Sequence, residues 1–405
     1  MAFKLAFKQS RPARSPIAKA ICRSIPLLVI AAIMSFSCGD KTTDSDSSPH
    51  QLNDAELTDV LDSYIADTAG VLGIMQKVNV PGYLPWNGAG GYFDTSRARE
   101  LDGSELFAIG SITKTFTATV IMQLYEEGDI VLDSPIVHYL PLDYGAVMAE
   151  IPHATGATIY QALCHRTGIY DYNGNWDHFI YPVLQDPGKS WIPMERLLIV
   201  RDYGSPYFIP GESYRYSNTN YLLLGVVIEN LEQQPYADVL QDRIADKIGL
   251  AETFYHAGII GDNFGNFAHG YDDELGHKYD ICEFNLTFAC AEGGIISSTG
   301  DLVTFFKALV NGQLFTHSAT FELMLDEGDA YSYGFGLNVI EHPVWGKGYE
   351  HGGSQLGQKS MVRYYANIEL VIASCLTQDG SVESSNASSI VDLMENKLIE
   401  LGVGD

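Results

Sequence analysis

The sequence predicts an α+β fold, because the strand candidates are grouped near the two ends of the chain and a long stretch with helical patterns separates them. Two strand candidates, Lys359 to Tyr365 and Leu370 to Leu376, are joined by a short turn at Ala366-Asn367. Two further candidates, Val71 to Val78 and Gly91 to Asp94, lie nearer the start. With 405 residues, of which 46% are hydrophobic, the chain can bury a sizeable core as one large domain or two medium ones.

Helical patterns lie before, between and after these strands. We expect an amphipathic helix at Asp54 to Ala66, another at Thr299 to Val310, and a closing C-terminal helix at Ser381 to Leu401. Between residues 111 and 216 the sequence is irregular and rich in Pro, Tyr and Gly, with short helical pieces such as Thr158 to Cys164.

The first 37 residues are typical of a secretory signal peptide. They carry six Lys or Arg residues and no acidic residue, and they contain the apolar run Ile25 to Met34, which is too short to span a bilayer comfortably. Cys38 resembles the lipidated cysteine of bacterial lipoproteins, although Ser35 stands where that pattern prefers leucine. Residues 38–50 then form a polar tether. We expect an exported, periplasmic or cell-envelope protein with a lipid at Cys38; ordinary cleavage and an uncleaved anchor are the alternatives.

The charge of the remaining chain limits its partners. Without the first 37 residues, 18 basic residues stand against 51 acidic residues, a formal charge of −33. Such a surface repels phosphate backbones and anionic lipid headgroups. We therefore expect no nucleic acid partner, and contact with a membrane only through the lipid anchor.

Ser111-Ile112-Thr113-Lys114 is the only Ser-x-x-Lys sequence in the chain. It follows a strand-like run, Leu106 to Ile109, and begins a helical pattern that Gly128 ends. Residues three apart on a helix are neighbours, so the Lys114 amine can take the proton of the Ser111 hydroxyl. The helix N-terminus also favours the oxyanion that forms when a serine attacks a carbonyl. The helix is predicted from one apolar stripe, which consists of Ile112, Phe116, Val120, Ile121 and Leu124.

Two further motifs follow in the chain. Tyr216-Ser217-Asn218 lies in a loop directly before the apolar helical run Leu222 to Ile228. His351-Gly352-Gly353 precedes the two C-terminal strand candidates. Taken alone, the first of these motifs is also typical of a helix-capping loop with Asn218 as N-cap, and the second of a surface histidine before a glycine turn.

Together the three motifs resemble the penicillin-recognising serine hydrolases. More narrowly, they are similar to the branch of class C β-lactamases, D-alanyl-D-alanine carboxypeptidases and related esterases, whose pattern is Ser-x-x-Lys, Tyr-x-Asn, then Lys-Thr-Gly or His-x-Gly. Five blocks in the family's order carry the resemblance: Phe107 to Ala118, Glu127 to Leu140, Pro210 to Glu229, Gly293 to Leu309 and Tyr333 to Leu337. The resemblance implies a β-lactamase/transpeptidase-like antiparallel sheet flanked by helices, a hydrolase domain at 51–405, and a helical insertion at roughly 130–290.

The resemblance also implies a role for each motif residue. Ser111 would be the nucleophile, and its N–H together with that of Ser354 would form the oxyanion hole. Lys114 would be the base if desolvation and a second cation lower its pKa. Tyr216 would share that role if the nearby ammonium makes its phenol more acidic. Asn218 would bind the substrate amide and help to hold Lys114.

His351 would line the cleft, with Gly352 and Gly353 admitting the substrate to the backbone. A charged imidazole at this position would hold a substrate carboxylate and titrate near pH ~6.5, whereas a neutral one would serve proton transfer or Lys114.

Among the remaining cysteines, Cys282 and Cys290 are the pair that we expect to form a disulfide after export. No His-Glu-x-x-His or His-x-His spacing occurs, so we expect no catalytic metal and no cofactor. No Gly-x-Ser-x-Gly sequence occurs either, which disfavours an α/β-hydrolase.

The function that we expect is a secreted serine hydrolase that forms an acyl-enzyme on Ser111 and cleaves a D-amino-acid peptide, an amide or an ester, with a small molecule or peptide as substrate. His351 in the third motif resembles carboxypeptidases and esterases more than true β-lactamases, which usually have lysine there. A β-lactamase proper is one alternative. A non-catalytic envelope protein that binds cell-wall peptides is another.

Overall fold

The computed structural model describes residues 49–404 except 262, 275, 327–331 and 381–385. The predicted signal peptide, Cys38 and most of the tether therefore lie outside the described residues, and these predictions stay open. Within the described ranges, no helix is both long enough and apolar enough to cross a bilayer.

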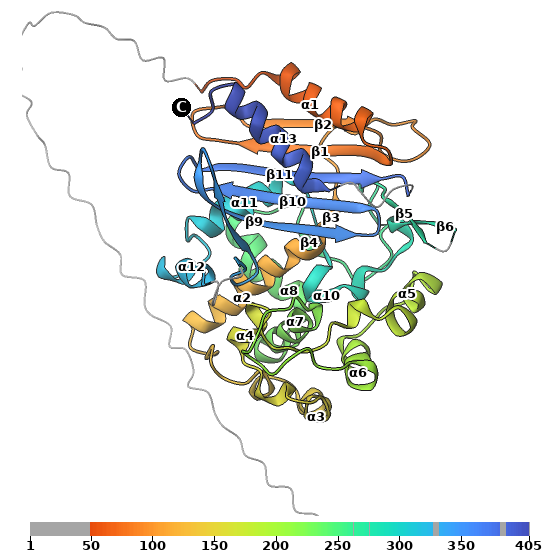
Figure 1. Ribbon diagram of the computed structural model, residues 1–405, viewed down its shortest axis with the longest axis vertical. Helices are drawn as coiled ribbons and strands as arrows, with labels where there is room; N and C mark the ends of the chain where they lie inside the picture. Colours follow the sequence, from red (N-terminus) through yellow and green to blue (C-terminus); the bar gives the residue numbers. More distant parts are fainter. Residues whose placement is uncertain (1–48, 262, 275, 327–331, 381–385, 405) are drawn as a thin grey trace, which may run out of the picture. The chain divides into compact units, whose positions relative to one another are not determined.

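A six-stranded antiparallel sheet organises the domain, with strand order β2-β1-β11-β10-β9-β8 (Figure 1). The first two strands come from the start of the domain and the other four from its end, and β1, β10 and β11 correspond to strands that the sequence predicted. Their bounds are β1 Val71–Asn79, β2 Trp86–Gly91, β8 Asn338–His342, β9 Gly346–Gln355, β10 Gln358–Tyr365 and β11 Leu370–Gln378. The predicted α+β class is confirmed.

Helices cover both faces of this sheet. Helices α1 (Asp54–Asp67) and α13 (Ala387–Glu400) lie on one face, and α11 (Thr299–Val310) packs on the other (Figure 1). Successive side chains of a strand point to opposite faces, so Ile372 of β11 packs toward α1 and α13 while its neighbour Ala373 packs into the larger core. Every residue of β11 is buried, which explains why its sequence is an apolar run without alternation.

Most other helices lie below the sheet in Figure 1, between β3 and β7 in the chain. These helices are α2 Thr113–Glu126, α3 Leu142–Glu150, α4 Ile159–Leu163, α5 Tyr181–Gln185, α6 Pro193–Tyr203, α7 Asn218–Glu232, α8 Tyr236–Leu240, α9 Asp246–Ile248 and α10 Cys290–Gly293, whereas α12 (Ala319–Met324) follows α11. The short strands are β3 Phe107–Ala108, β4 Phe254–Tyr255, β5 Tyr271–Glu274, β6 His277–Asp280 and β7 Ile295–Ser297. The boundaries of the helical insertion at roughly 130–290 stay a prediction.

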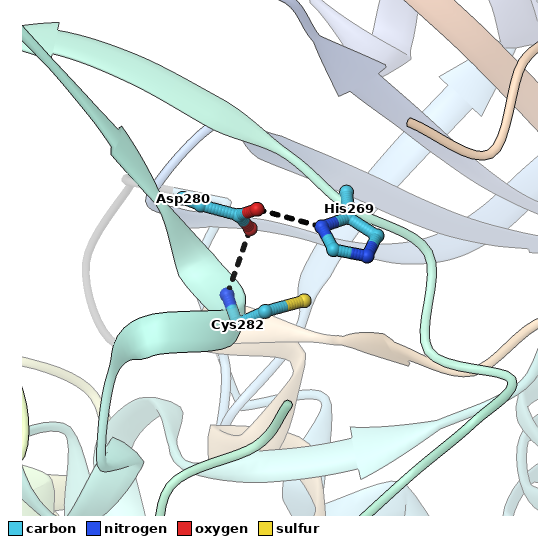
Figure 2. Close-up of side chains that lie close together, drawn as sticks. All are labelled: His269, Asp280 and Cys282. Atoms are coloured by element: carbon cyan, nitrogen blue, oxygen red, sulfur yellow. Dashed lines mark hydrogen bonds and ion pairs between the residues drawn. The ribbon is translucent and has the colours of Figure 1, made fainter. Parts of the chain in front are cut away.

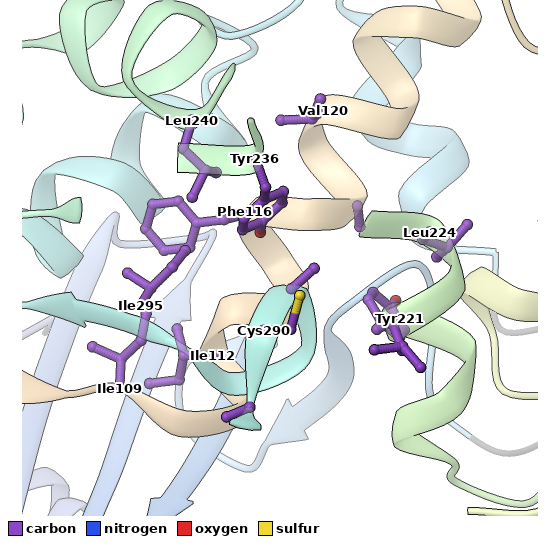
Figure 3. Packing of buried hydrophobic residues seen from close by; sticks show 14 of the residues in the cluster. Ile109, Ile112, Phe116, Val120, Tyr221, Leu224, Tyr236, Leu240, Cys290 and Ile295 are labelled. Atoms are coloured by element: carbon purple, nitrogen blue, oxygen red, sulfur yellow. The ribbon is translucent and has the colours of Figure 1, made fainter. Parts of the chain in front are cut away.

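The apolar residues that predicted helix α2 are all buried, and from Thr113 to Leu124 the helix has no solvent face. Every residue from Thr113 to Leu124 is buried, because helices α7 and α10 and strand β7 pack around it (Figure 3). The buried threonines of this helix satisfy their hydroxyls internally: Thr117 donates to the Ala291 carbonyl at 2.6 Å, and Thr115 donates to the Gly336 carbonyl at 2.6 Å.

Two predicted boundaries also differ from the structure. The strand predicted at Gly91 to Asp94 is wrong except for Gly91, because β2 instead covers Trp86–Gly91, a segment with three glycines that pairing with β1 holds extended. The C-terminal helix begins at Ala387, where Asn386 caps it by accepting a hydrogen bond from the Ser388 N–H.

A buried ion-pair network joins the sheet to α13. The guanidinium of Arg363 on β10 donates to Glu350 on β9 at 2.7 Å and to both carboxylate oxygens of Glu395 on α13 at 2.8 and 2.9 Å. The side chains of Arg363 and Glu395 are 9% and 5% exposed. Removing one charge of such a pair leaves the other buried without compensation.

We predict that Arg363→Leu lowers the free energy of unfolding by about 3 kcal/mol, measured by urea denaturation. The double variant Arg363→Leu/Glu395→Leu should regain part of this loss, because it removes the most buried carboxylate, whereas Glu350, at 16% exposure, still loses its partner. Arg201→Leu, which removes an exposed ion pair with Asp202, is the control and should leave the midpoint unchanged. A loss in Arg363→Leu no larger than in this control would contradict the prediction.

Candidate active site

Ser111 lies in a single 3₁₀ turn, Gly110–Ile112, which continues directly into α2. Strand β3 ends two residues before this turn begins. Between them, the Ile109 N–H donates to the Ile295 carbonyl of β7 at 3.0 Å. The turn is therefore fixed on the sheet side by backbone pairing and on the other side by the buried helix. This local structure agrees with the predicted position of Ser111 at a helix start.

Lys114 has three hydrogen-bond acceptors and is 0% exposed. Its Nζ lies 3.1 Å from the Ser111 Oγ, 2.8 Å from the Asn218 Oδ1 and 2.6 Å from the Glu292 carbonyl oxygen. An ammonium has three protons and no lone pair, so the charged form donates to all three. The structure thus brings together Ser111, Lys114 and Asn218, which the sequence separates by up to 107 residues.

Burial lowers the pKa of Lys114 to about 7, against the opposing effect of the Glu292 and Asp171 carboxylates. Desolvation is thus the cause, as predicted, but the expected second cation is not: the charged groups that act on Lys114 are acidic and favour its protonated form. Near neutral pH the amine is therefore present in both forms, which is the condition for a general base.

Tyr216 lies in the loop before α7, with Lys114 Nζ 4.9 Å from the centre of its ring and with its hydroxyl hydrogen-bonded to the Ser111 side chain. The expectation of a more acidic phenol is wrong. Burial raises the pKa of Tyr216, and this outweighs the lowering by the Ser111 hydrogen bond. Tyr216 is therefore a neutral phenol that can accept and donate hydrogen bonds but is not an anionic base.

His351 lies on β9 and is neutral. Its Nδ1 donates to the Gly352 carbonyl at 2.6 Å, and its Nε2 accepts from the Tyr333 hydroxyl at 3.0 Å. Burial, together with the positive charge of Lys114, lowers the pKa of His351 to about 3. This excludes the charged form that would hold a substrate carboxylate and leaves the alternative of a neutral imidazole beside the site.

The turn of Ser111 and strand β9 touch through their backbones. A Cβ on Gly110 would lie 2.5 Å from the Ser354 nitrogen, and a Cβ on Gly353 would lie 1.9 Å from the Ile109 carbonyl oxygen. Gly353 is therefore required by the packing of β9 against the chain before Ser111, and not only by access for a substrate as the sequence suggested. The contact sets the Ser354 N–H beside the turn that carries the Ser111 N–H.

A cavity of about 700 Å³ opens above these groups. Ser111, Tyr216, His351, Gly353 and Ser354 all line it, as the sequence predicted for a substrate site. Lys114 and Asn218 lie directly behind Ser111 and reach the cavity through hydrogen bonds. The other lining residues are Tyr214, Tyr333, Asn338, Gly352, Lys359, Ser360, Met361 and Asn386.

Two carboxylates at the site, the half-buried Asp171 and the buried Glu292, were not found from the sequence. Asp171 accepts from the N–H of Asn218 at 3.1 Å and from its side-chain amide at 3.2 Å, so the Asn218 Oδ1 must face Lys114. Glu292 accepts a hydrogen bond from the Tyr172 hydroxyl and lies 3.7 Å from the Arg196 guanidinium, and burial raises its pKa. The available signal for Glu292 was an acidic residue inside the apolar segment before Gly293.

The predicted disulfide between Cys282 and Cys290 is wrong, because the structure contains both as free thiols. Cys282 lies in the 3₁₀ turn Ile281–Glu283, and a second 3₁₀ turn, Leu286–Phe288, follows before Cys290, so the two thiols lie in different surroundings. Cys290 packs in the core beside α2 and α8 (Figure 3), whereas Cys282 lies next to Asp280 and His269 (Figure 2).

Comparison with known proteins agrees with this geometry. The Beta-lactamase family model matches residues 61–393. Penicillin-binding protein 4* of Bacillus subtilis is 29% identical over 295 residues, which are 68% of this chain and 61% of that protein. A D-aminopeptidase of Cereibacter sphaeroides is 23% identical over 345 residues, 82% of this chain and 60% of that protein. The match to either relative thus spans about 60% of the relative's length.

Solved structures show the same fold. A D-stereospecific amidohydrolase from a Streptomyces species is 28% identical with a TM-score of 0.70, covering 84% of this chain and 98% of that one. The D-amino acid amidase of Ochrobactrum anthropi SV3, in complex with L-phenylalanine amide, has a TM-score of 0.71 at 23% identity, covering 86% and 99% of the two chains. The predicted family and fold are confirmed: the chain belongs to the Beta-lactamase family of penicillin-recognising serine hydrolases.

Proposed function

We propose that this protein hydrolyses a D-amino-acid peptide, amide or ester through an acyl-enzyme on Ser111. The observation that carries the proposal is the buried Lys114 amine held against the Ser111 hydroxyl. The similarity to proteins named D-aminopeptidase and D-stereospecific amidohydrolase supports a D-amino-acid substrate. Within this class, two features decide which substrate the cavity favours: the neutral charge of His351 and the charges of the other residues that line the cavity.

The hydrogen bonds of Lys114 support its role as the base. When Lys114 is neutral, it has two N–H groups, and both donate to oxygens that can only accept a hydrogen bond. These are the Glu292 carbonyl oxygen and the Asn218 Oδ1, whose orientation Asp171 fixes. The lone pair must then face Ser111, whose hydroxyl donates to it. Lys114 takes this proton as the Ser111 Oγ attacks the substrate carbonyl carbon.

The remaining steps use the groups around Ser111. The oxyanion would accept hydrogen bonds from the Ser111 and Ser354 N–H groups. The proton on Lys114 then passes to the leaving group, with the neutral Tyr216 hydroxyl as a relay beside Ser111. Water hydrolyses the acyl-enzyme with the same groups acting in reverse and releases the product acid.

The cavity lining supports a substrate with a carboxylate. Lys359 is a cation in the lining, and its Nζ donates to the Ser354 Oγ at 2.7 Å. The described residues that line the cavity include no Asp or Glu. A negative group of the substrate is therefore favoured over a positive one, which supports cleavage of a peptide with a free C-terminal carboxylate, as in a D-alanyl-D-alanine carboxypeptidase.

Export and a lipid anchor at Cys38 are proposed from the sequence alone, on the basis of the basic start, the apolar run and the polar tether.

We expect Ser111→Ala to lower turnover by on the order of 10⁴ or more while the fold stays intact. The measurement compares wild type and Ser111→Ala on a D-Ala-D-Ala peptide, a D-amino-acid amide, a short-chain p-nitrophenyl ester and nitrocefin. Intact-mass spectrometry with a fluorophosphonate should show an adduct on wild type only. An active Ser111→Ala protein would refute the mechanism, and an adduct on wild type without any turnover would favour a binding protein over an enzyme.

We expect Lys359→Met to lower kcat/KM for the D-Ala-D-Ala peptide about 5- to 10-fold, because a partly exposed ion pair contributes about 1 kcal/mol. For the neutral ester, kcat/KM should change by less than about 2-fold. Lys347→Met removes an exposed lysine outside the cavity and is the matched control. If Lys359→Met affects both substrates equally, the lysine does not bind the carboxylate.

The rate should rise with pH through about 7, where the Lys114 amine loses its proton, and level off above. A D-Ala-D-Ala peptide and a neutral ester should show the same acid limb in kcat/KM, since His351 stays neutral over this range. Glu292→Gln removes a carboxylate that raises the pKa of Lys114, so the limb should move to lower pH. Exposed Glu283→Gln is the control. A limb that moves instead on His351→Asn would assign the titration to the histidine.

A further inference from the structure

Three side chains with different ligand atoms meet at the base of the β5–β6 hairpin, outside the cavity. The imidazole of His269, the carboxylate of Asp280 and the thiol of Cys282 have ligand atoms that all lie within 4.8 Å of one another. Figure 2 shows the Asp280 carboxylate hydrogen-bonded to His269 Nδ1, at 2.6 Å, and to the backbone N–H of Cys282. Donor atoms around a tetrahedral zinc ion lie about 3.5 Å apart, so small side-chain rotations suffice to place an ion among them.

The backbone holds these three residues in place. The His269 N–H donates to the Phe93 carbonyl at 3.1 Å, and the Cys282 N–H donates to the Asp280 Oδ1 at 3.0 Å. On the other side, the Gly261 N–H donates to the Cys282 carbonyl at 2.9 Å. Antiparallel pairing of Tyr271 with Asp280 aligns the two strands of the hairpin. Cys282 is 8% exposed, whereas the side chains of His269 and Asp280 are 27% and 18% exposed, so one side remains open to a water ligand.

The charge around the cluster also favours a cation. Asp94 lies close enough to interact electrostatically with His269, and Glu283 does the same with Cys282. Imidazole nitrogen, thiolate sulfur and carboxylate oxygen are together the ligand set that zinc accepts, whereas magnesium and calcium prefer oxygen alone. We propose that His269, Asp280 and Cys282 bind one Zn²⁺ ion, with water in the fourth position.

The proposed ion has a structural role. None of its three ligands lines the cavity. The neighbours of His269 instead support the turn between β9 and β10: the Ala268 carbonyl accepts from the Gln358 side chain at 2.6 Å, and a Cβ on Gly270 would lie 2.7 Å from the Gly357 carbonyl oxygen. An ion that links the two ends of the hairpin would hold residues 268–270 against the turn between β9 and β10. Strand β9 carries Ser354, so the ion would stabilise the position of that strand.

The test measures zinc bound by the purified full chain. After treatment with a chelator, the protein is loaded with ZnCl₂, desalted and analysed for metal and protein content. Wild type should retain about one zinc ion per chain and gain thermal stability on loading. With Co²⁺ in place of zinc, wild type should show a thiolate-to-cobalt charge-transfer band.

The variants decide whether these ligands are responsible. Cys282→Ser should lose the zinc, the thermal shift and the cobalt band, whereas Cys164→Ser, which changes another buried free thiol, should keep all three. Asp280→Asn keeps an acceptor for the Cys282 N–H and removes the charge, so it should also lose the zinc even if Cys282→Ser fails to fold. The proposal is overturned if wild type retains no zinc above the desalted blank, or if both folded variants retain as much as wild type.

Discussion

The active site depends on one buried cation, the Lys114 ammonium. Removing a lysine from water is costly unless its protons are used, and here each proton has an acceptor: Ser111, Asn218 and the Glu292 carbonyl. These acceptors belong to the nucleophile turn, α7 and α10, so the same contacts that solvate the amine also align these three elements. A substitution that displaces any one of them disturbs both the base and the local packing.

The acidic groups behind Lys114 limit how far burial can lower its pKa. Desolvation alone favours the neutral amine, whereas Glu292 and Asp171 favour the ammonium, and the balance lies at about 7. Glu292 is itself held by Tyr172 and by Arg196, which is 0% exposed. The base is therefore tuned by a network that reaches from α10 to α6 and whose side chains do not line the substrate cavity.

The sequence predicted the motif residues well because their signals are local or match a known pattern. Ser111 and Lys114 are three residues apart at a helix start, and the structure keeps them together. Asp171 and the packing role of Gly353 escaped prediction, because both depend on contacts with chain far away in sequence: Asn218 in one case and the Ile109 carbonyl in the other. The charge of His351 depends on burial and on its Tyr333 partner, which no local pattern reveals.

The same difference between local signals and long-range contacts explains which parts of the fold were predicted. The β10–β11 hairpin and α11 were predicted within about two residues, since their apolar patterns and turns are strong. Strand β2 was misplaced, because a segment with three glycines has little strand preference and is held extended only by pairing with β1. Helix α2 was predicted from its apolar residues, but the burial of its threonines was not, because their hydroxyls donate to carbonyls of residues far away in sequence.

The burial of α2 from Thr113 to Leu124 links catalysis to global unfolding. A helix without a solvent face cannot fray or open by itself, so its amide protons exchange with water only when the surrounding helices separate. The turn that carries Ser111 continues directly into this helix, so the position of the Ser111 side chain persists as long as the core is intact. Loss of activity on heating should therefore coincide with cooperative melting of the domain, without a folded form that has lost its nucleophile geometry.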